Sequence, residues 1–195
     1  LKTPLSVIKG YLSLLLDGIY GEISDEQRKI IASVGDQTDR LARLIQQLLD
    51  VSRFEAGGGR LEIHTIELRP FLEELATSFD ALAVQNEIDF AVQLGTDLPE
   101  TIEGDADRLN EVIGNLLSNA FKFTPRNRRI RMRAGTADGG IGIPITDTGV
   151  GVPQDKLPRI FEKFFQVEND AQPRSVGSGL GLAISREIVD AHGGT

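Results

Sequence analysis

Two asparagines and a lysine recur at helical spacing within residues 109–125. Asn115 and Asn119 are four residues apart and Lys122 follows three later, so their side chains share one edge of a predicted helix. Amide oxygens can bind a hard cation such as Mg²⁺, and an ammonium group can neutralise phosphate. The row therefore suits a metal–phosphate group lying along the helix. Taken alone, the row is more typical of a polar helix edge that faces water. The other motifs of the chain favour the metal–phosphate interpretation.

The helix that carries this row has an apolar stripe on its other side. Asp105 is expected to cap its first turn and Pro125 to end it, because proline disfavours helical geometry at the residue before it. Asp105 and Asp107 are then partners of the helix terminus rather than a catalytic pair. The stripe consists of Leu109, Val112, Ile113, Leu116, Leu117 and Ala120.

An aspartate followed by two spaced glycines stands at the end of a later predicted strand. Gly149 and Gly151 let the backbone approach a ligand closely, and the acceptor-only carboxylate of Asp147 could receive the exocyclic amine of adenine. A plain turn is the alternative. The Asp-Thr-Gly triplet also occurs in aspartic proteases, but those require a second catalytic aspartate, and no second triplet is present.

A second glycine-rich turn opens the last predicted helix, residues 180–191. Residues 177–181 read Gly-Ser-Gly-Leu-Gly, and free N–H groups at such a helix N-terminus attract anions. The turn fits neither a P-loop nor the dinucleotide-binding fingerprint. Before it lie Phe161, Phe164 and the polar residues 166–176, a composition typical of a mobile loop. We expect the glycines to belong to a lid over phosphates.

The first 56 residues predict two amphipathic helices joined by a short turn. Ser24 and Gln27 form a predicted capping box that opens the second helix, which ends near residue 55. A lone hairpin cannot bury both flanks of its apolar seam, so we expect a dimer that forms a four-helix bundle. Packing on the C-terminal region is the alternative. The seam comprises Leu5, Ile8, Leu12, Leu15, Ile19, Ile31, Val34, Thr38, Leu41, Ile45, Leu48 and Ser52.

The remainder mixes strands and helices, which predicts an α/β sandwich with helices on one face. The basic run 126–133 alternates with apolar residues and lacks an aromatic platform, so it predicts a half-buried strand rather than a nucleic-acid site. A helix is expected at 70–85 and strands at 61–66, 88–94, 101–103 and 142–146.

Composition narrows the possible functions. The 195 residues carry a net charge of −8 and no cysteine, which argues against non-specific nucleic-acid binding and excludes disulfides and thiolate chemistry. His64 and His192 are far apart, so a structural zinc site is not expected. No segment approaches the roughly 20 apolar residues of a membrane span. Because the chain opens at Leu1 without methionine, we interpret it as a fragment. We expect this fragment to make no direct membrane contact.

The order of these motifs resembles that of a sensor histidine kinase. Residues 101–195 resemble its GHKL-type catalytic ATP-binding domain, and residues 1–56 resemble its dimerisation and histidine-phosphotransfer hairpin. The first five residues, Leu-Lys-Thr-Pro-Leu, match the tail of the H box His-Glu-Leu-Lys-Thr-Pro-Leu. The matching boxes are the N box (115–122), the first glycine box (147–151), the F box (161–164) and the second glycine box (177–181). The resemblance implies an α+β chain with domains 1–56 and 57–195, the latter shortened at its C-terminus.

The resemblance also implies the role of each motif residue. Asn119 would hold Mg²⁺ with help from Asn115, and Lys122 would contact phosphate. Asn115 would also be a catalytic residue. Asp147 would recognise adenine. Thr3 matches the position that helps to hydrolyse the phospho-aspartate of the partner response regulator. The remaining ATP-binding set is Gly149, Gly151, Phe161, Phe164, Gly177, Ser178, Gly179, Leu180 and Gly181.

Three departures from the family pattern qualify this expectation. The phosphoacceptor histidine would lie two residues before Leu1, so the 195 residues should bind ATP without phosphorylating themselves. Asn127 and Arg128 replace two glycines that the family often has, so a hairpin turn there should differ. The chain also stops at Thr195, where the family usually adds further strands.

The function implied is therefore a two-component kinase core that uses ATP and Mg²⁺. It would pass the γ-phosphate to a histidine and then to an aspartate of a response regulator, as a cytoplasmic homodimer whose parent protein can be membrane-anchored. A GHKL-type ATPase is one alternative, although such enzymes carry a glutamate where Asn115 stands. A pseudokinase or dimeric scaffold is the other.

Overall fold

The computed structural model describes residues 2–55, 60–137, 139–167 and 177–195. The chain divides into two compact units, Leu1–Gly59 and Arg60–Thr195, and each is considered by itself. No helix among the described residues has the length and apolar composition needed to cross a bilayer.

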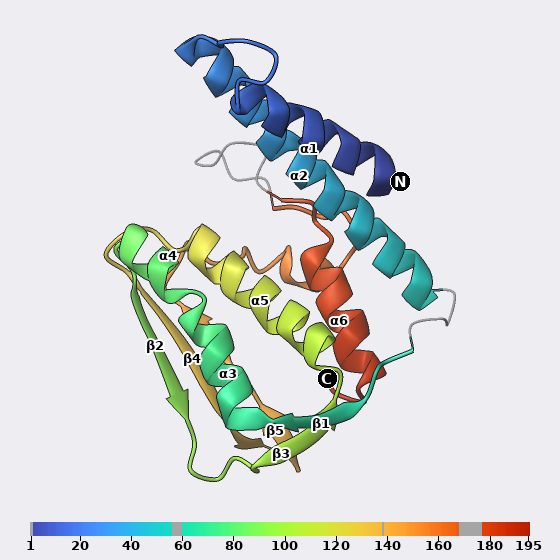
Figure 1. The fold of residues 1–195 in the computed structure, drawn as a ribbon. Helices are drawn as coiled ribbons and strands as arrows, with labels where there is room; N and C mark the ends of the chain where they lie inside the picture. Colours follow the sequence, from blue (N-terminus) through green and yellow to red (C-terminus); the bar gives the residue numbers. More distant parts are fainter. Residues whose placement is uncertain (1, 56–59, 138, 168–176) are drawn as a thin grey trace. The chain divides into compact units, whose positions relative to one another are not determined.

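The first unit is the predicted helical hairpin, formed by α1 (Lys2–Leu16) and α2 (Asp25–Glu55) (Figure 1). Gly18 and Gly21 turn the chain with φ of 74° and 115°, which glycine adopts at little cost. The capping box is confirmed, because the Gln27 N–H donates to Ser24 Oγ at 3.2 Å and the Ser24 N–H donates to Gln27 Oε1 at 2.8 Å.

The hairpin covers only part of its apolar seam. On α2, Thr38 is buried, whereas Val34, Leu41 and Leu48 are 44%, 48% and 46% exposed. These three residues recur every seven positions, so they form a continuous apolar line on one side of the helix. Of the seam residues predicted in the first helix and its turn, Ile8 and Ile19 are 42% and 65% exposed.

The helices of the second unit form one layer. They are α3 (Leu68–Thr77), α4 (Asp80–Gln85), α5 (Ala106–Phe123) and α6 (Gly181–Ala191). The single helix predicted for 70–85 is wrong, because the chain breaks at Ser78 and Phe79. The Ser78 hydroxyl donates to the Leu75 carbonyl at 2.6 Å, a local bond that competes with helix continuation. Phe79 stacks on Phe121 with ring centroids 5.6 Å apart.

The strands form a small pair and a mixed sheet (Figure 1). β1 (His64–Glu67) pairs antiparallel with β3 (Thr101–Gly104), so the predicted strand 61–66 begins three residues late. β2 (Asp89–Leu94) runs parallel to β4 (Arg129–Ala137), which pairs antiparallel with β5 (Gly140–Gly142) and β6 (Ile145–Asp147). The predicted strand 142–146 is interrupted at Pro144, which has no N–H to donate. A short 3₁₀ helix, η1 (Leu157–Arg159), follows.

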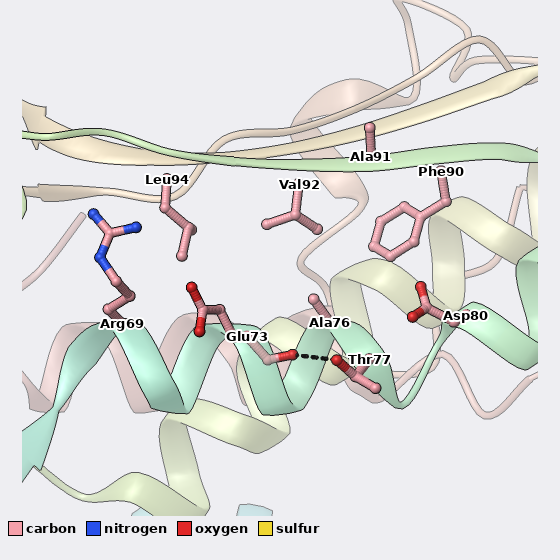
Figure 2. A pocket seen from close by; sticks show the side chains of 9 residues that line it. All are labelled: Arg69, Glu73, Ala76, Thr77, Asp80, Phe90, Ala91, Val92 and Leu94. Carbon is pink, nitrogen blue, oxygen red and sulfur yellow. Dashed lines mark hydrogen bonds between the residues drawn. The ribbon is translucent and has the colours of Figure 1, made fainter.

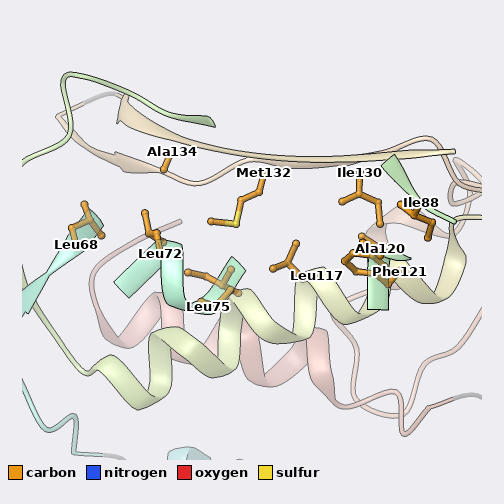
Figure 3. Packing of buried hydrophobic residues seen from close by; sticks show 12 residues of the cluster. Leu68, Leu72, Leu75, Ile88, Leu117, Ala120, Phe121, Ile130, Met132 and Ala134 are labelled. Carbon is orange, nitrogen blue, oxygen red and sulfur yellow. The ribbon is translucent and has the colours of Figure 1, made fainter. Parts of the chain in front are cut away.

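The hydrophobic core lies between the sheet and the helices (Figure 3). Leu72, Leu117, Ile130 and Met132 are fully buried there. Ile130, Met132 and Ala134 point inward, while the arginines between them lie on the outer face. The prediction that the basic run is a half-buried strand is therefore confirmed.

The turn at residues 127–128 joins α5 to β4 and is not a hairpin turn. That expectation is corrected, because β4 pairs with later strands and with β2. Asn127 has a φ of 58°, a left-handed conformation that asparagine tolerates better than most residues. Its N–H donates to the Glu87 carbonyl at 2.8 Å, which ties the turn to the start of β2.

Asp105 caps α5 as predicted and also ties three segments together. Its carboxylate accepts the N–H groups of Arg108 at 3.1 Å and Glu62 at 3.0 Å. Its own N–H donates to His192 Nε2 at 3.1 Å, so the proton of that imidazole sits on Nδ1, 2.8 Å from the Ile188 carbonyl. Burial opposes the charge of Asp105, but the two N–H groups outweigh it and hold its pKa below the ordinary value. Asp105 is thus a structural residue.

Candidate functional site

The polar row of α5 lies beside the start of α6. α5 and α6 run side by side in the helix layer (Figure 1). The Asn115 Nδ2 group lies 3.4 Å from the Gly181 carbonyl oxygen and 3.5 Å from Ser185 Oγ. Asn115, Asn119 and Lys122 are each half-buried, so the row is partly enclosed by the protein rather than freely solvated.

The first glycine box lies against the C-terminal end of α5. A Cβ atom on Gly149 would lie 2.4 Å from the Phe123 carbonyl oxygen, and the Val150 N–H donates to that same oxygen at 3.3 Å. Only glycine permits this approach. The contact brings the loop after β6 to the end of the helix that carries Asn119 and Lys122.

Asp147, the last residue of β6, sits on the inner side of the sheet. It pairs with the fully buried Ile130 in the antiparallel ladder, and directly opposed residues share one face. Its Oδ1 accepts the Gly149 N–H at 2.8 Å. Asp147 is nevertheless exposed to solvent, so a ligand can reach this residue.

The second glycine box approaches the same end of α5. Gly177 has a φ of 127°, and a Cβ atom there would lie 3.0 Å from Lys122 Nζ. Leu180 is 1% exposed, and its carbonyl accepts the Ile184 N–H at 2.9 Å, so the predicted contact of this residue with ATP finds no support in its geometry. Ser178 Oγ accepts the Leu180 N–H at 3.1 Å just before α6 begins. The glycine turn thus lies beside the ammonium group that was expected to contact phosphate.

The F box is held against the second glycine box by backbone contacts. The Phe164 N–H donates to the Gly179 carbonyl at 2.9 Å, and a Cβ atom on Gly179 would lie 2.7 Å from the Phe164 carbonyl carbon. Phe164 has a φ of 65°, which is unusual for an aromatic residue. Phe161 and Phe164 are 41% and 62% exposed, so neither is an ordinary core residue.

Several predicted residues contribute no side-chain geometry to this site. Thr3 lies in the first turn of α1, and its side chain is outside the described part of the chain. Residues 166–176 were predicted to form a mobile loop. Of these, residues 168–176 lie outside the part of the chain that the structure describes. Gly151 has a φ of 68° and open space around it, so its conformation rather than a close contact favours glycine.

The structure adds Ser185, which sequence analysis missed. It is 4% exposed and lies four residues after Gly181, one turn into α6. No sequence signal pointed to it, because its proximity to Asn115 arises only from the packing of α5 against α6.

The side chains of Asn115, Asn119 and Lys122 fit a Mg²⁺ ion that is also bound by phosphate oxygens. Among the described residues, no group of three or more His, Asp or Glu side chains could hold a metal ion. The groups present are amide oxygens and an ammonium group, which would leave the remaining positions around Mg²⁺ to phosphate oxygens and water.

A separate pocket of about 410 Å³ lies between α3 and β2 (Figure 2). Phe90, Val92 and Leu94 face it from the strand, and Arg69, Glu73 and Asp80 from the helical side. It contains none of the motif residues described above. It is therefore distinct from the site on α5 and α6.

Two family models match this chain. Residues 1–57 match the His Kinase A (phospho-acceptor) domain, and residues 104–195 match the histidine kinase-, DNA gyrase B- and HSP90-like ATPase domain. The structure of a mycobacterial sensor histidine kinase, MprB, is 30% identical with a TM-score of 0.54, and the match covers 67% of this chain and 80% of that one. The chain belongs to the sensor histidine kinase family.

Other histidine kinases match nearly the whole chain. The circadian input-output histidine kinase CikA of Synechococcus elongatus is 31% identical over 195 residues, which are 100% of this chain and 26% of that protein. Full-length ShkA, solved in complex with AMPPNP, is 30% identical with a TM-score of 0.82, and the match covers 98% of this chain and 39% of that one. This kinase sequence thus spans well under half of those two relatives.

Proposed function

We propose that this histidine kinase chain binds Mg²⁺–ATP on α5 and α6 and transfers the γ-phosphoryl group to a histidine. The observation that carries the proposal is the convergence of the Asp147 loop, Lys122 and the glycine turn at the C-terminal end of α5. The AMPPNP complex of ShkA, the relative with a TM-score of 0.82, supports nucleotide binding by this chain.

Each end of the nucleotide has a chemical counterpart here. Asp147 would accept the exocyclic amine of adenine with the oxygen that does not hold the Gly149 N–H. Lys122 and the N–H groups of the glycine turn would bind phosphate oxygens. Asn119, with Asn115, would hold Mg²⁺, which when bound neutralises charge on the transferring phosphoryl group.

The phosphoryl acceptor is a histidine in a different environment from the two present here. His64 is exposed on β1, and His192 is hydrogen-bonded through both ring nitrogens at the end of α6. In the family pattern, the acceptor would belong to the H box whose tail Leu1–Leu5 resembles, and an aspartate of a response regulator would receive the phosphoryl group next. Thr3 would assist hydrolysis of that phospho-aspartate, and the reaction would take place in the cytoplasm.

An ATPase is the second candidate, and the geometry of Asn115 disfavours it. A water-activating base is needed at this position, but the carboxamide of Asn115 cannot accept a proton at neutral pH. Its Nδ2 group also faces the Gly181 carbonyl oxygen. A glutamate at this position would place a carboxylate oxygen against that carbonyl oxygen, and neither of the two can donate a hydrogen bond. The site is thus suited to positioning ATP rather than to hydrolysing it.

Calorimetric titration with nucleotide tests the assigned site. We expect Mg²⁺–ATP to bind at least about tenfold more tightly than Mg²⁺–GTP, because guanine presents a carbonyl oxygen where adenine presents the amine. Equal affinities for the two nucleotides would contradict the role of Asp147.

We also propose that the hairpin forms a homodimer through residues 1–56. Val34, Leu41 and Leu48 form an exposed apolar line, and a second copy of the chain could bury it by packing the same line against it. Leu41→Asp is expected to remove the burial of one leucine from each subunit. The dimer should lose at least about 3 kcal/mol, and its Kd should rise more than about 100-fold.

Light scattering at micromolar concentration measures this change. The unmodified chain should be a dimer and Leu41→Asp a monomer. Ser33→Asp, at an exposed position of α2 off the apolar line, should remain a dimer. A monomeric unmodified chain would count against the bundle.

A further inference from the structure

Asn115 is held by α6 through one half of its carboxamide. The Gly181 carbonyl oxygen can only accept a hydrogen bond, so the carboxamide atom 3.4 Å from it must be the NH₂ group. Ser185 Oγ lies 3.5 Å from the same nitrogen. Both distances are at the long end of the hydrogen-bonding range. The Gly181 carbonyl defines which way the amide faces, and the Ser185 hydroxyl, which can accept, adds a second partner for the same NH₂ group.

The other half of the carboxamide is left for a ligand. Asn115 Oδ1 accepts no hydrogen bond from the described residues, and Asn115 itself is only half-buried. Gly181 has no side chain to cover Asn115 Oδ1. A Cβ atom at position 181 would lie 3.5 Å from that oxygen. A carboxamide oxygen fixed in this way is a hard, neutral donor that suits a divalent cation or one of its bound water molecules.

We propose that Ser185 is a positioning residue that orients Asn115 so that its Oδ1, and not its NH₂ group, faces the Mg²⁺–phosphate part of the nucleotide. The inference rests on the proposed function. Ser185 is 4% exposed, so it acts through Asn115 and does not need to touch the nucleotide. Without the hydroxyl, the Gly181 carbonyl alone would hold the NH₂ group, at a long distance of 3.4 Å. The amide would then rotate more readily and present N–H donors to the cation, an interaction that is repulsive.

The test measures ATP affinity by calorimetry with Mg²⁺ and again with EDTA. In Ser185→Ala, the gain in affinity that Mg²⁺ brings should fall about two- to tenfold, which is the worth of one neutral hydrogen bond. The affinity measured in EDTA should stay within about twofold of the unmodified chain. Ser185→Thr retains the hydroxyl and should restore the gain. Ser33→Ala, at an exposed serine of α2 outside every ATP-binding box, should match the unmodified chain in both conditions.

NMR offers a readout that does not depend on nucleotide. The side-chain NH₂ signals of Asn115 should exchange faster with water in Ser185→Ala than in the unmodified chain, because one acceptor is lost. Unchanged exchange would overturn the inference, as would an equal loss of affinity with and without Mg²⁺. An unmodified chain that gains nothing from Mg²⁺ would overturn both this inference and the proposed Mg²⁺–ATP site. A normal gain in Ser185→Ala would overturn the inference alone.

Discussion

Asp147→Asn is expected to weaken ATP binding at least about tenfold, a loss of about 1.4 kcal/mol. One carboxylate oxygen already accepts the Gly149 N–H at 2.8 Å. In the asparagine variant, the amide oxygen would keep that bond, so the NH₂ group would replace the second oxygen. A donor would then face the amine donor of adenine. Calorimetry with Mg²⁺–ATP measures the effect.

Asp155→Asn is the matched control for this change. Asp155 is exposed and lies 3.3 Å from the ammonium of the neighbouring Lys156, outside the site. The same loss of one negative charge there should leave ATP affinity unchanged. If Asp147→Asn bound ATP as tightly as this control, the adenine assignment would be wrong.

Gly149→Ala is expected to destabilise the second unit by about 2–4 kcal/mol and to lower ATP affinity by more than about tenfold. The new Cβ atom would lie 2.4 Å from the Phe123 carbonyl oxygen and 2.7 Å from Asp147 Oδ1. Because the first of these is a backbone atom, either the loop or the end of α5 must move. Such a shift separates Asp147 from Lys122 and so affects both ends of the nucleotide.

Gly151→Ala separates steric clash from backbone conformation. Gly151 has a φ of 68° but nothing within 4 Å of a Cβ atom, so alanine there should cost only about 1 kcal/mol and retain ATP binding. Urea unfolding of both variants at one protein concentration gives the comparison, since dimerisation affects apparent stability. Equal destabilisation by the two substitutions would show that the Phe123 contact is not what selects glycine at position 149.

Local patterns predicted most of the fold, and the exceptions have local causes. The spacing of apolar residues located α5, and a capping box located the start of α2. The break between α3 and α4 was missed because Phe71, Leu75, Phe79 and Leu82 fit a single helical stripe. The periodicity gives no sign that the Ser78 hydroxyl bonds back to the Leu75 carbonyl. The parallel pairing of β2 with β4 was also not predicted, since strand order depends on long-range contacts.

The site could be predicted at the level of residue types but not of contacts. Gly149 was expected to allow a close approach to a ligand, yet its nearest neighbour is the Phe123 carbonyl of its own chain. Ser185 was missed because a serine inside a helix has no distinctive spacing, and its proximity to Asn115 arises only when α5 and α6 pack. The predicted roles of Asn119, Lys122 and Asp147 remain proposals that the substitutions above test.

The most direct measurement is phosphoryl transfer in a chain extended by His-Glu ahead of Leu1, which completes the H box of the family pattern. With Mg²⁺ and γ-labelled ATP, the protein should acquire a label that is labile in acid and stable in base, the behaviour of phosphohistidine. A chain extended by Ala-Glu should acquire none. Free phosphate without labelled protein would contradict the kinase account and favour an ATPase, and bound ATP with neither product would favour a scaffold.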